Sequence, residues 1–189
     1  MLERMSTTFE IPTLRTDRWT LRAFQAADLD ALATMQANPE VRRFLGGNLL
    51  TRAEAWSLME RNLGQWGLRG YGMFAVDVEG HCAGWAGVLH PLEWPEPELA
   101  YSLDQPFWGR GIATEAARAA REWAFARLDV ERLASFIMAD NVRSARVAEK
   151  LGAVRDGTTT IRGFAVDWWV HRRAQEVTKG IPPETLEMG

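Results

Sequence analysis

The feature that most constrains the 189-residue sequence is a short turn between a strand-like segment and a long helical one. The strand-like segment Glu98–Leu103 is followed by Gly109 and Gly111, and the helical pattern 111–128 begins at the second glycine. The N–H groups at a helix start have no intrahelical partner and carry a partial positive charge. Glycine has no Cβ to keep an anion away from them. The turn therefore predicts either a phosphate site or a tight strand-to-helix connection without a ligand.

Two well-known phosphate motifs do not fit this turn. A P-loop ends in Gly-Lys-Ser/Thr, which is absent, and the dinucleotide fingerprint needs a third glycine near Thr114. Arg110, between the two glycines, would add a charge-assisted contact to a bound anion.

The hydrophobic pattern of the rest of the chain alternates between the periods of strands and helices. Strands are predicted at 16–24, 71–78, 81–90, 98–103, 132–138, 154–161 and 164–171, and helices at 28–36, 51–70, 111–128 and 141–151. This order indicates a mixed α/β fold. We expect residues 1–175 to form one domain and residues 176–189, which include Pro182 and Pro183, to form a loosely ordered extension.

Composition excludes several classes of function. A formal net charge of −3 argues against nucleic acid as a partner, because phosphate neutralisation needs a basic face. The single cysteine, Cys82, excludes an internal disulfide and a cysteine-rich metal cluster, and its apolar surroundings indicate a small buried hydrophobe. No apolar run reaches the ~18 residues of a membrane span, and residues 1–9 lack a signal-peptide core. We therefore expect a cytoplasmic protein without a membrane partner.

Two segments together indicate a family. The first is WGRGIATEA at 108–116, and the second is NVRS at 141–144, continuing to EKLGA at 149–153. This pair resembles the GNAT superfamily of acetyl-CoA-dependent N-acyltransferases, most closely its ribosomal-protein-alanine acetyltransferase branch. The resemblance covers about 15–175 and implies a GNAT fold, a mixed and mostly antiparallel sheet of six to seven strands flanked by about four helices.

The resemblance also implies how acetyl-CoA, the co-substrate, is held without a metal. Its diphosphate would rest on the turn and the helix start, at Trp108, Gly109, Arg110, Gly111, Ile112, Ala113 and Thr114. The N–H of Leu103 would face the thioester carbonyl, and Asn141 would contact the cofactor arm. Asn141 is equally suited to cap the helix that it precedes.

Transfer to an amine requires a base for the amine and an acid for the departing thiolate. The family transfers the acetyl group directly, so Cys82 need not be a nucleophile. We predict Glu98 as the base, acting through water, with a surface carboxylate at a strand end as the alternative. We predict Ser144 as the acid or thiol-orienting group, because the position where many relatives have a tyrosine is Ala148. Ser144 can equally be an ordinary residue of a first helical turn.

The acceptor is predicted from the free energy of deprotonation. At pH 7 a lysine amine costs about 4.6 kcal/mol to deprotonate and an N-terminal amine about 1.4 kcal/mol. A water-mediated base favours the N-terminal α-amine of a protein or peptide, which is also the acceptor that the family branch implies. The alternatives are a small amine, such as an aminoglycoside or polyamine, and a non-catalytic acyl-CoA-binding module. Trp168 and Trp169 on a terminal strand also lead us to consider a homodimer.

Overall fold

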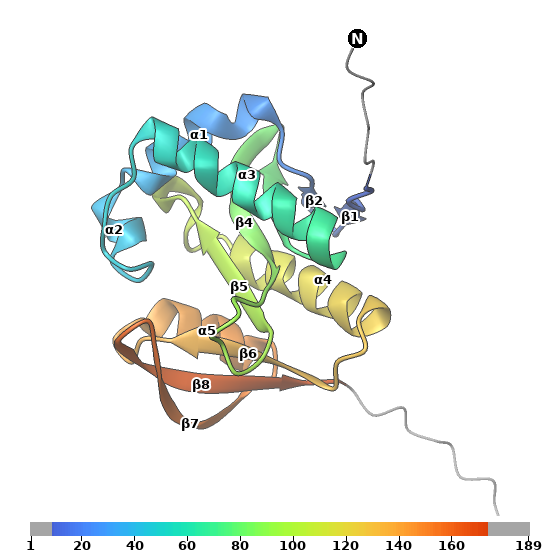
Figure 1. Cartoon of the computed structure of the whole chain (residues 1–189), viewed down its shortest axis with the longest axis vertical. Helices are drawn as coiled ribbons and strands as arrows, with labels where there is room; N and C mark the ends of the chain where they lie inside the picture. The colour runs from blue at the N-terminus through green and yellow to red at the C-terminus, as the bar shows by residue number, and fades with distance from the viewer. Residues whose placement is uncertain (1–8, 174–189) are drawn as a thin grey trace, which may run out of the picture.

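The computed structural model describes residues 9–173, so the predicted extension at 176–189 lies outside the described residues. An eight-stranded sheet has the order β1-β2-β3-β4-β5-β6-β8-β7, and only the β5–β6 pair is parallel (Figure 1). The strands are β1 Leu14–Arg15, β2 Thr20–Arg22, β3 Met73–Val78, β4 His81–Leu89, β5 Glu98–Leu103, β6 Arg132–Ile137, β7 Val154–Ile161 and β8 Phe164–Arg172. The helices are α1 Leu29–Gln36, α2 Pro39–Arg42, α3 Arg52–Arg69, α4 Ile112–Arg127 and α5 Val142–Lys150, with two 3₁₀ turns, Ala26–Asp28 and Gln105–Phe107. The predicted mixed, mostly antiparallel sheet is confirmed.

The counts differ from the prediction in two places. The predicted strand 16–24 is shorter, Thr20–Arg22 (β2), and it pairs with an additional strand, β1, that precedes residue 16. The turn between them is closed by the Thr16 hydroxyl, which accepts the Trp19 N–H at 2.9 Å. The additional helix, α2, is one turn long, and it starts with Pro39 just inside its end and Asn38 accepting the Glu40 N–H at 3.0 Å. Both features are too short for a periodic hydrophobic pattern to reveal.

The helices cover the two faces of the sheet with separate apolar clusters. Along β3, alternate residues point to opposite faces. Phe74, Val76 and Val78 pack in the cluster that contains α4, while Met73 and Ala75 pack in the cluster with α1 and the first half of α3. Figure 1 shows β6, β7, β8 and α5 gathered at one end of the molecule, away from α1 to α3.

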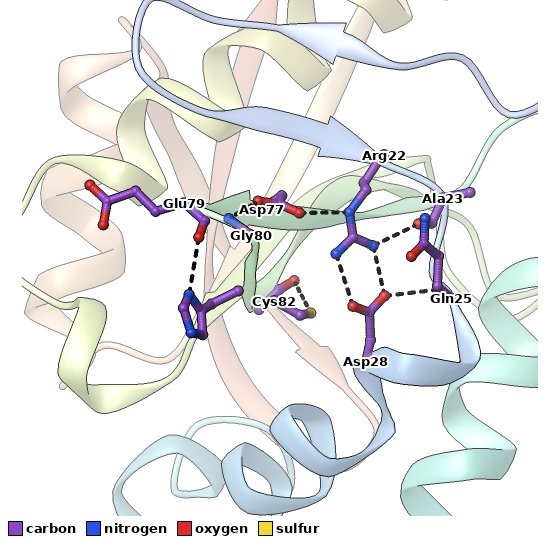
Figure 2. A network of polar contacts seen from close by, with 10 residues as sticks. Arg22, Ala23, Gln25, Asp28, Asp77, Glu79, Gly80 and Cys82 are labelled. Carbon is purple, nitrogen blue, oxygen red and sulfur yellow. Dashed lines mark hydrogen bonds and ion pairs between the residues drawn. The ribbon is translucent and has the colours of Figure 1, made fainter.

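A buried polar network fastens β2 to β3 and to the start of α1 (Figure 2). The Arg22 guanidinium donates to both carboxylate oxygens of Asp28 at 2.8 and 2.9 Å and to Asp77 at 2.8 Å. Asp28 also accepts the Gln25 N–H at 2.8 Å. These hydrogen bonds raise the pKa of Arg22 despite the opposing effect of burial. Beside the network, burial raises the pKa of the Cys82 thiol to about 11, so Cys82 is the inert buried side chain that the sequence predicts.

We predict that Arg22→Ala lowers the free energy of unfolding by about 3–5 kcal/mol, because Asp28 would be left buried without its partner. Arg52→Ala is the matched control, since the Arg52–Asp30 pair has the same 2.8 Å separation but is exposed to solvent. It should cost less than about 1 kcal/mol. Urea unfolding of both variants measures the difference, and equal losses would contradict a stabilising role for the network.

Candidate active site

The site begins where the parallel strands β5 and β6 separate. The two strands share one residue pair, Glu98 with Ala134, next to which Pro97 O accepts the Ala134 N–H at 2.9 Å. Beyond this point they diverge (Figure 1). The Asp104 N–H donates to Ala83 O of β4, so by alternation the main-chain groups of Tyr101 and Leu103 point to the other edge, toward the gap. The predicted residue Leu103 therefore lies on an open strand edge.

Side chains replace the missing backbone pairing at the point of divergence. Glu98 Oε1 accepts the Phe136 N–H at 3.1 Å, and the Ser135 hydroxyl donates to Leu99 O at 2.6 Å. Since a carbonyl only accepts, the Ser135 hydroxyl proton lies in the hydrogen bond to Leu99 O. The Ser135 oxygen must therefore accept a hydrogen bond from Nε2 of His171, 3.0 Å away. Burial lowers the pKa of His171 to about 4, so this histidine is neutral. Its hydrogen bond fixes the Ser135 hydroxyl, which links β6 to β5.

Glu98 is 8% exposed and is not the surface carboxylate considered as an alternative. Burial raises its pKa to about 8, although the Phe136 hydrogen bond and the nearby charge of Arg162 oppose the shift. A buried carboxyl group with a pKa near neutrality is suited to accept and release a proton at physiological pH.

The start of α5 lies on the opposite side of β5 from Glu98. Asn141 Oδ1 accepts the Ser144 N–H at 3.3 Å, so Asn141 caps α5, as its alternative role predicted. Ser144 O accepts a hydrogen bond of 2.9 Å from the hydroxyl of Tyr101 in β5. Ser144 is therefore next to Tyr101 and not next to Glu98.

The turn before α4 exposes a row of main-chain donors. Trp108 uses both of its own donors inside the turn: its indole N–H bonds Leu103 O at 2.7 Å and its amide bonds Gln105 O at 3.1 Å. Within residues 9–173, the amides from Gly109 to Thr114 donate to no protein acceptor. Gly109 and Gly111 have φ of 75° and 78°, a left-handed conformation that favours glycine, and a Cβ on Gly109 would meet nothing within 4 Å. A Cβ on Gly111 would instead lie 3.3 Å from the Arg18 guanidinium.

The β1–β2 turn holds this helix start in place. Glu115 accepts the Thr16 hydroxyl at 2.6 Å and pairs with the Arg18 guanidinium at 2.6 Å, and these bonds lower its pKa against the effect of burial. A groove of about 520 Å³ lies beside the contact. Its charged lining residues are Arg15, Asp17, Arg18, Glu115, Arg118, Glu122 and Lys150. The free amides thus adjoin a groove in which both signs of charge are present.

An aromatic cluster lies beside Glu98 on the other side of the gap. Phe136 contacts Trp94 and Trp168, with ring centroids 5.4 and 5.5 Å apart. Glu96 anchors the cluster, accepting the Trp168 indole N–H at 2.6 Å. Trp169 is buried against α5, so both tryptophans that led us to consider a homodimer pack within the chain.

Sequence patterns missed Tyr101, Phe136 and Ser135, although the alternation of β5 places Tyr101 on the face opposite Glu98. Within residues 9–173, no three His, Cys, Asp or Glu side chains are grouped to hold a metal ion. No helix in that range is long and apolar enough to cross a membrane.

A mixed sheet with one diverging parallel pair, next to a helix start whose amides have no protein acceptor within residues 9–173, defines a class of α/β protein with a main-chain site suited to an anion. Residues 18–154 match the acetyltransferase (GNAT) domain, and the chain belongs to this family of acetyl-CoA-dependent acyltransferases.

Solved and curated relatives agree with this assignment. An acetyltransferase from Agrobacterium tumefaciens superposes with a TM-score of 0.78 at 33% identity, over 90% of this chain and 99% of that one. The uncharacterized N-acetyltransferase p20 of Bacillus licheniformis is 26% identical over 77% of this chain and 84% of its own length. RimL, a ribosomal L7/L12 α-N-protein acetyltransferase solved with coenzyme A, shares the fold with a TM-score of 0.71 at 19% identity, over 85% of this chain and 98% of that one.

We predict that Glu98→Gln stabilises the protein more at pH 9 than at pH 5. Because folding raises the pKa of Glu98 to about 8, the stability that its neutral form provides is present at low pH. That stability is lost as the pH rises from the unfolded value, about 4.3, through 8. Glutamine does not titrate, so the difference in unfolding free energy should grow over this range. Glu93→Gln, on the exposed loop before β5, controls for the loss of a carboxylate, and a pH-independent difference for Glu98→Gln would contradict the prediction.

Proposed function

We propose that the protein transfers an acetyl group from acetyl-CoA to the N-terminal α-amine of a protein or peptide. The observation that supports cofactor binding is the row of amides from Gly109 to Thr114 that have no acceptor among residues 9–173. Such a row at a helix start binds a diphosphate through main-chain N–H groups and the helix dipole. Arg110 adds a positive charge, and Arg118 and Lys150 in the adjoining groove provide cations for the nucleotide end.

The thioester arm would then run along the open edge of β5. The N–H of Leu103 can donate to the arm, as it would donate to a neighbouring strand. Asn141 borders the same gap from the start of α5. Trp108 shapes the turn, because its indole N–H holds Leu103 O and its ring stacks under the Arg143 guanidinium at 4.3 Å. Ser144 lies in the first turn of α5 and would orient the thiol.

Glu98 would accept the proton of the amine through water. Its pKa of about 8 equals that of an α-ammonium group, also about 8, so this transfer is close to neutral in free energy. A lysine side chain, with a pKa near 10.4, would make the same step about 3 kcal/mol uphill. RimL, which shares the fold, acetylates a protein α-amine according to its description. Both considerations favour the α-amine over the small-amine alternative, and membership of an acetyltransferase family favours an enzyme over a binding module.

We predict that Gly109→Ala weakens acetyl-CoA binding at least tenfold, because alanine disfavours the left-handed φ of 75° that sets the direction of the amides in this turn. Gly70→Ala is the matched control: Gly70 ends α3 with φ of 70° and also has nothing within 4 Å of its Cβ position. Both variants should lose similar stability, about 1 kcal/mol, but only Gly109→Ala should lose affinity in isothermal titration calorimetry. Equal affinities would contradict a phosphate site at the turn.

The acceptor is tested with three kinds of amine: peptides whose α-amine is free and whose lysines are blocked, peptides blocked at the α-amine with a free lysine, and polyamines or aminoglycosides. Mass spectrometry of the products should show acetylation of the free α-amines, with kcat/KM at least tenfold above the other two classes. Glu98→Gln should lower that value by about 10²-fold, the usual contribution of a general base. Turnover restricted to small amines would overturn the proposed acceptor.

A further inference from the structure

Arg162 occupies a turn position that disfavours arginine. The β7–β8 pairing ends at Ile161 and Phe164, so Arg162 and Gly163 form a two-residue hairpin turn. Their φ angles are 50° and 83°, the left-handed pair of a type I′ turn, whose first position is usually asparagine, aspartate or glycine. A left-handed arginine is strained, and such strain clusters at positions that bind ligands. The side chain of Arg162 is therefore a candidate for ligand recognition.

The turn holds the Arg162 guanidinium over the aromatic cluster beside Glu98. Its Cζ lies 5.5 Å from the ring centroid of Trp94, and the Trp94 ring lies 5.4 Å from that of Phe136. The Phe136 N–H in turn donates to Glu98 at 3.1 Å. Arg162 is exposed and Glu98 is buried, so the arginine stands at the outer edge of the site that contains the carboxyl group.

The positive charge of Arg162 has no partner in the described part of the chain. The buried carboxylate of the aromatic cluster, Glu96, is taken by Arg132 at 2.7 Å. Arg162 forms no ion pair within residues 9–173, although Glu93 stands next to Trp94 in the chain. A carboxylate supplied by a ligand would complete this edge of the site.

An unpartnered arginine at this place opposes the approach of an ammonium group. The α-amine of an acceptor is largely protonated at neutral pH and must come close to Glu98, so Arg162 repels it. A carboxylate near the amine offsets the repulsion by binding the guanidinium, which the ring of Trp94 holds in place. The two ring contacts between Phe136 and Arg162 cover a distance that three extended residues span, about 10 Å.

On the basis of the proposed function, we propose that Arg162 selects acceptors with an aspartate or glutamate among their first three residues. The guanidinium donates to the acceptor carboxylate at the outer edge of the site, while the α-amine reaches Glu98 through water farther in. Arg162 takes no part in the transfer itself and is a specificity-determining residue. The acceptor is then a protein or peptide with an acidic N-terminal segment.

The test compares lysine-free peptides that differ only in having Asp or Asn at the first, second or third position. For the wild type, kcat/KM should be about fivefold higher for the best Asp peptide than for its Asn partner, the upper end for an exposed ion pair. Salt at about 1 M, where the Debye length is about 3 Å, should remove the preference. The ratio is the readout, because the Arg162 charge also lowers the pKa of Glu98 and its loss changes the rates of all peptides together.

Three variants separate recognition from folding. Arg162→Asn removes the charge and supplies a residue that the turn favours, so it should keep the fold and bring the ratio to about one. Arg162→Glu should invert the preference, so that arginine at the same peptide position is acetylated faster than aspartate. Arg155→Gln is the control, because it removes an arginine of the same hairpin that is paired with Asp167 at 2.6 Å. It should keep the wild-type ratio.

The outcomes distinguish this inference from the proposed function. A wild-type ratio below twofold at all three positions, or a ratio that Arg162→Asn leaves unchanged, would overturn the role of Arg162 while acetylation of α-amines stands. A wild-type protein that acetylates none of the peptide α-amines would overturn the proposed function, and the role of Arg162 with it.

Discussion

The separation of β5 from β6 after a single residue pair is the constraint on which the rest of the site depends. Buried main-chain groups need hydrogen-bond partners, and two parallel strands that diverge no longer supply them to one another. Side chains supply these partners where the strands begin to separate. Glu98 accepts the Phe136 N–H, and the Ser135 hydroxyl donates to the Leu99 carbonyl. Farther along, β6 no longer pairs with the edge at Tyr101 and Leu103, and the Leu103 carbonyl accepts the Trp108 indole N–H instead.

The same constraint explains the electrostatics of Glu98. Its carboxyl group is buried because it bridges the two strands, and burial is what raises its pKa toward 8. A residue that bridges β5 and β6 thereby has a carboxyl group whose pKa lies close to neutrality. Tyr101, on the other face, is half-buried, and desolvation of its hydroxyl raises its pKa.

The helix start of α4 needs its own support, since unpaired amides and two left-handed glycines do not stabilise a turn. The support comes from Glu115, which binds the distant β1–β2 turn through Thr16 and Arg18. The first turn of the helix is thereby held by one end of the sheet, and its amides remain free to point outward. The stacking of Arg143 on Trp108 connects this turn to α5 across the gap.

The sequence by itself determined the features that depend on neighbouring residues. Examples are the two long helices, predicted at 51–70 and 111–128 and observed as α3 and α4, and the turn at Gly109 and Gly111 that precedes α4. Each of these is fixed by the conformational preferences of a few adjacent residues, and together with the two family segments they determined the fold class. The short β1–β2 hairpin and α2 escaped prediction because neither is long enough to show a period.

Only the tertiary structure decided the environment of each functional side chain. Glu98 and Tyr101 look like ordinary strand residues in the sequence, and Ser144 looks like an ordinary helix residue. Their burial, the pKa values of Glu98 and Tyr101, and the contact between Tyr101 and Ser144 arise from elements that are far apart along the chain. Desolvation and long-range hydrogen bonds depend on which atoms surround a group in space, and local sequence does not contain that information.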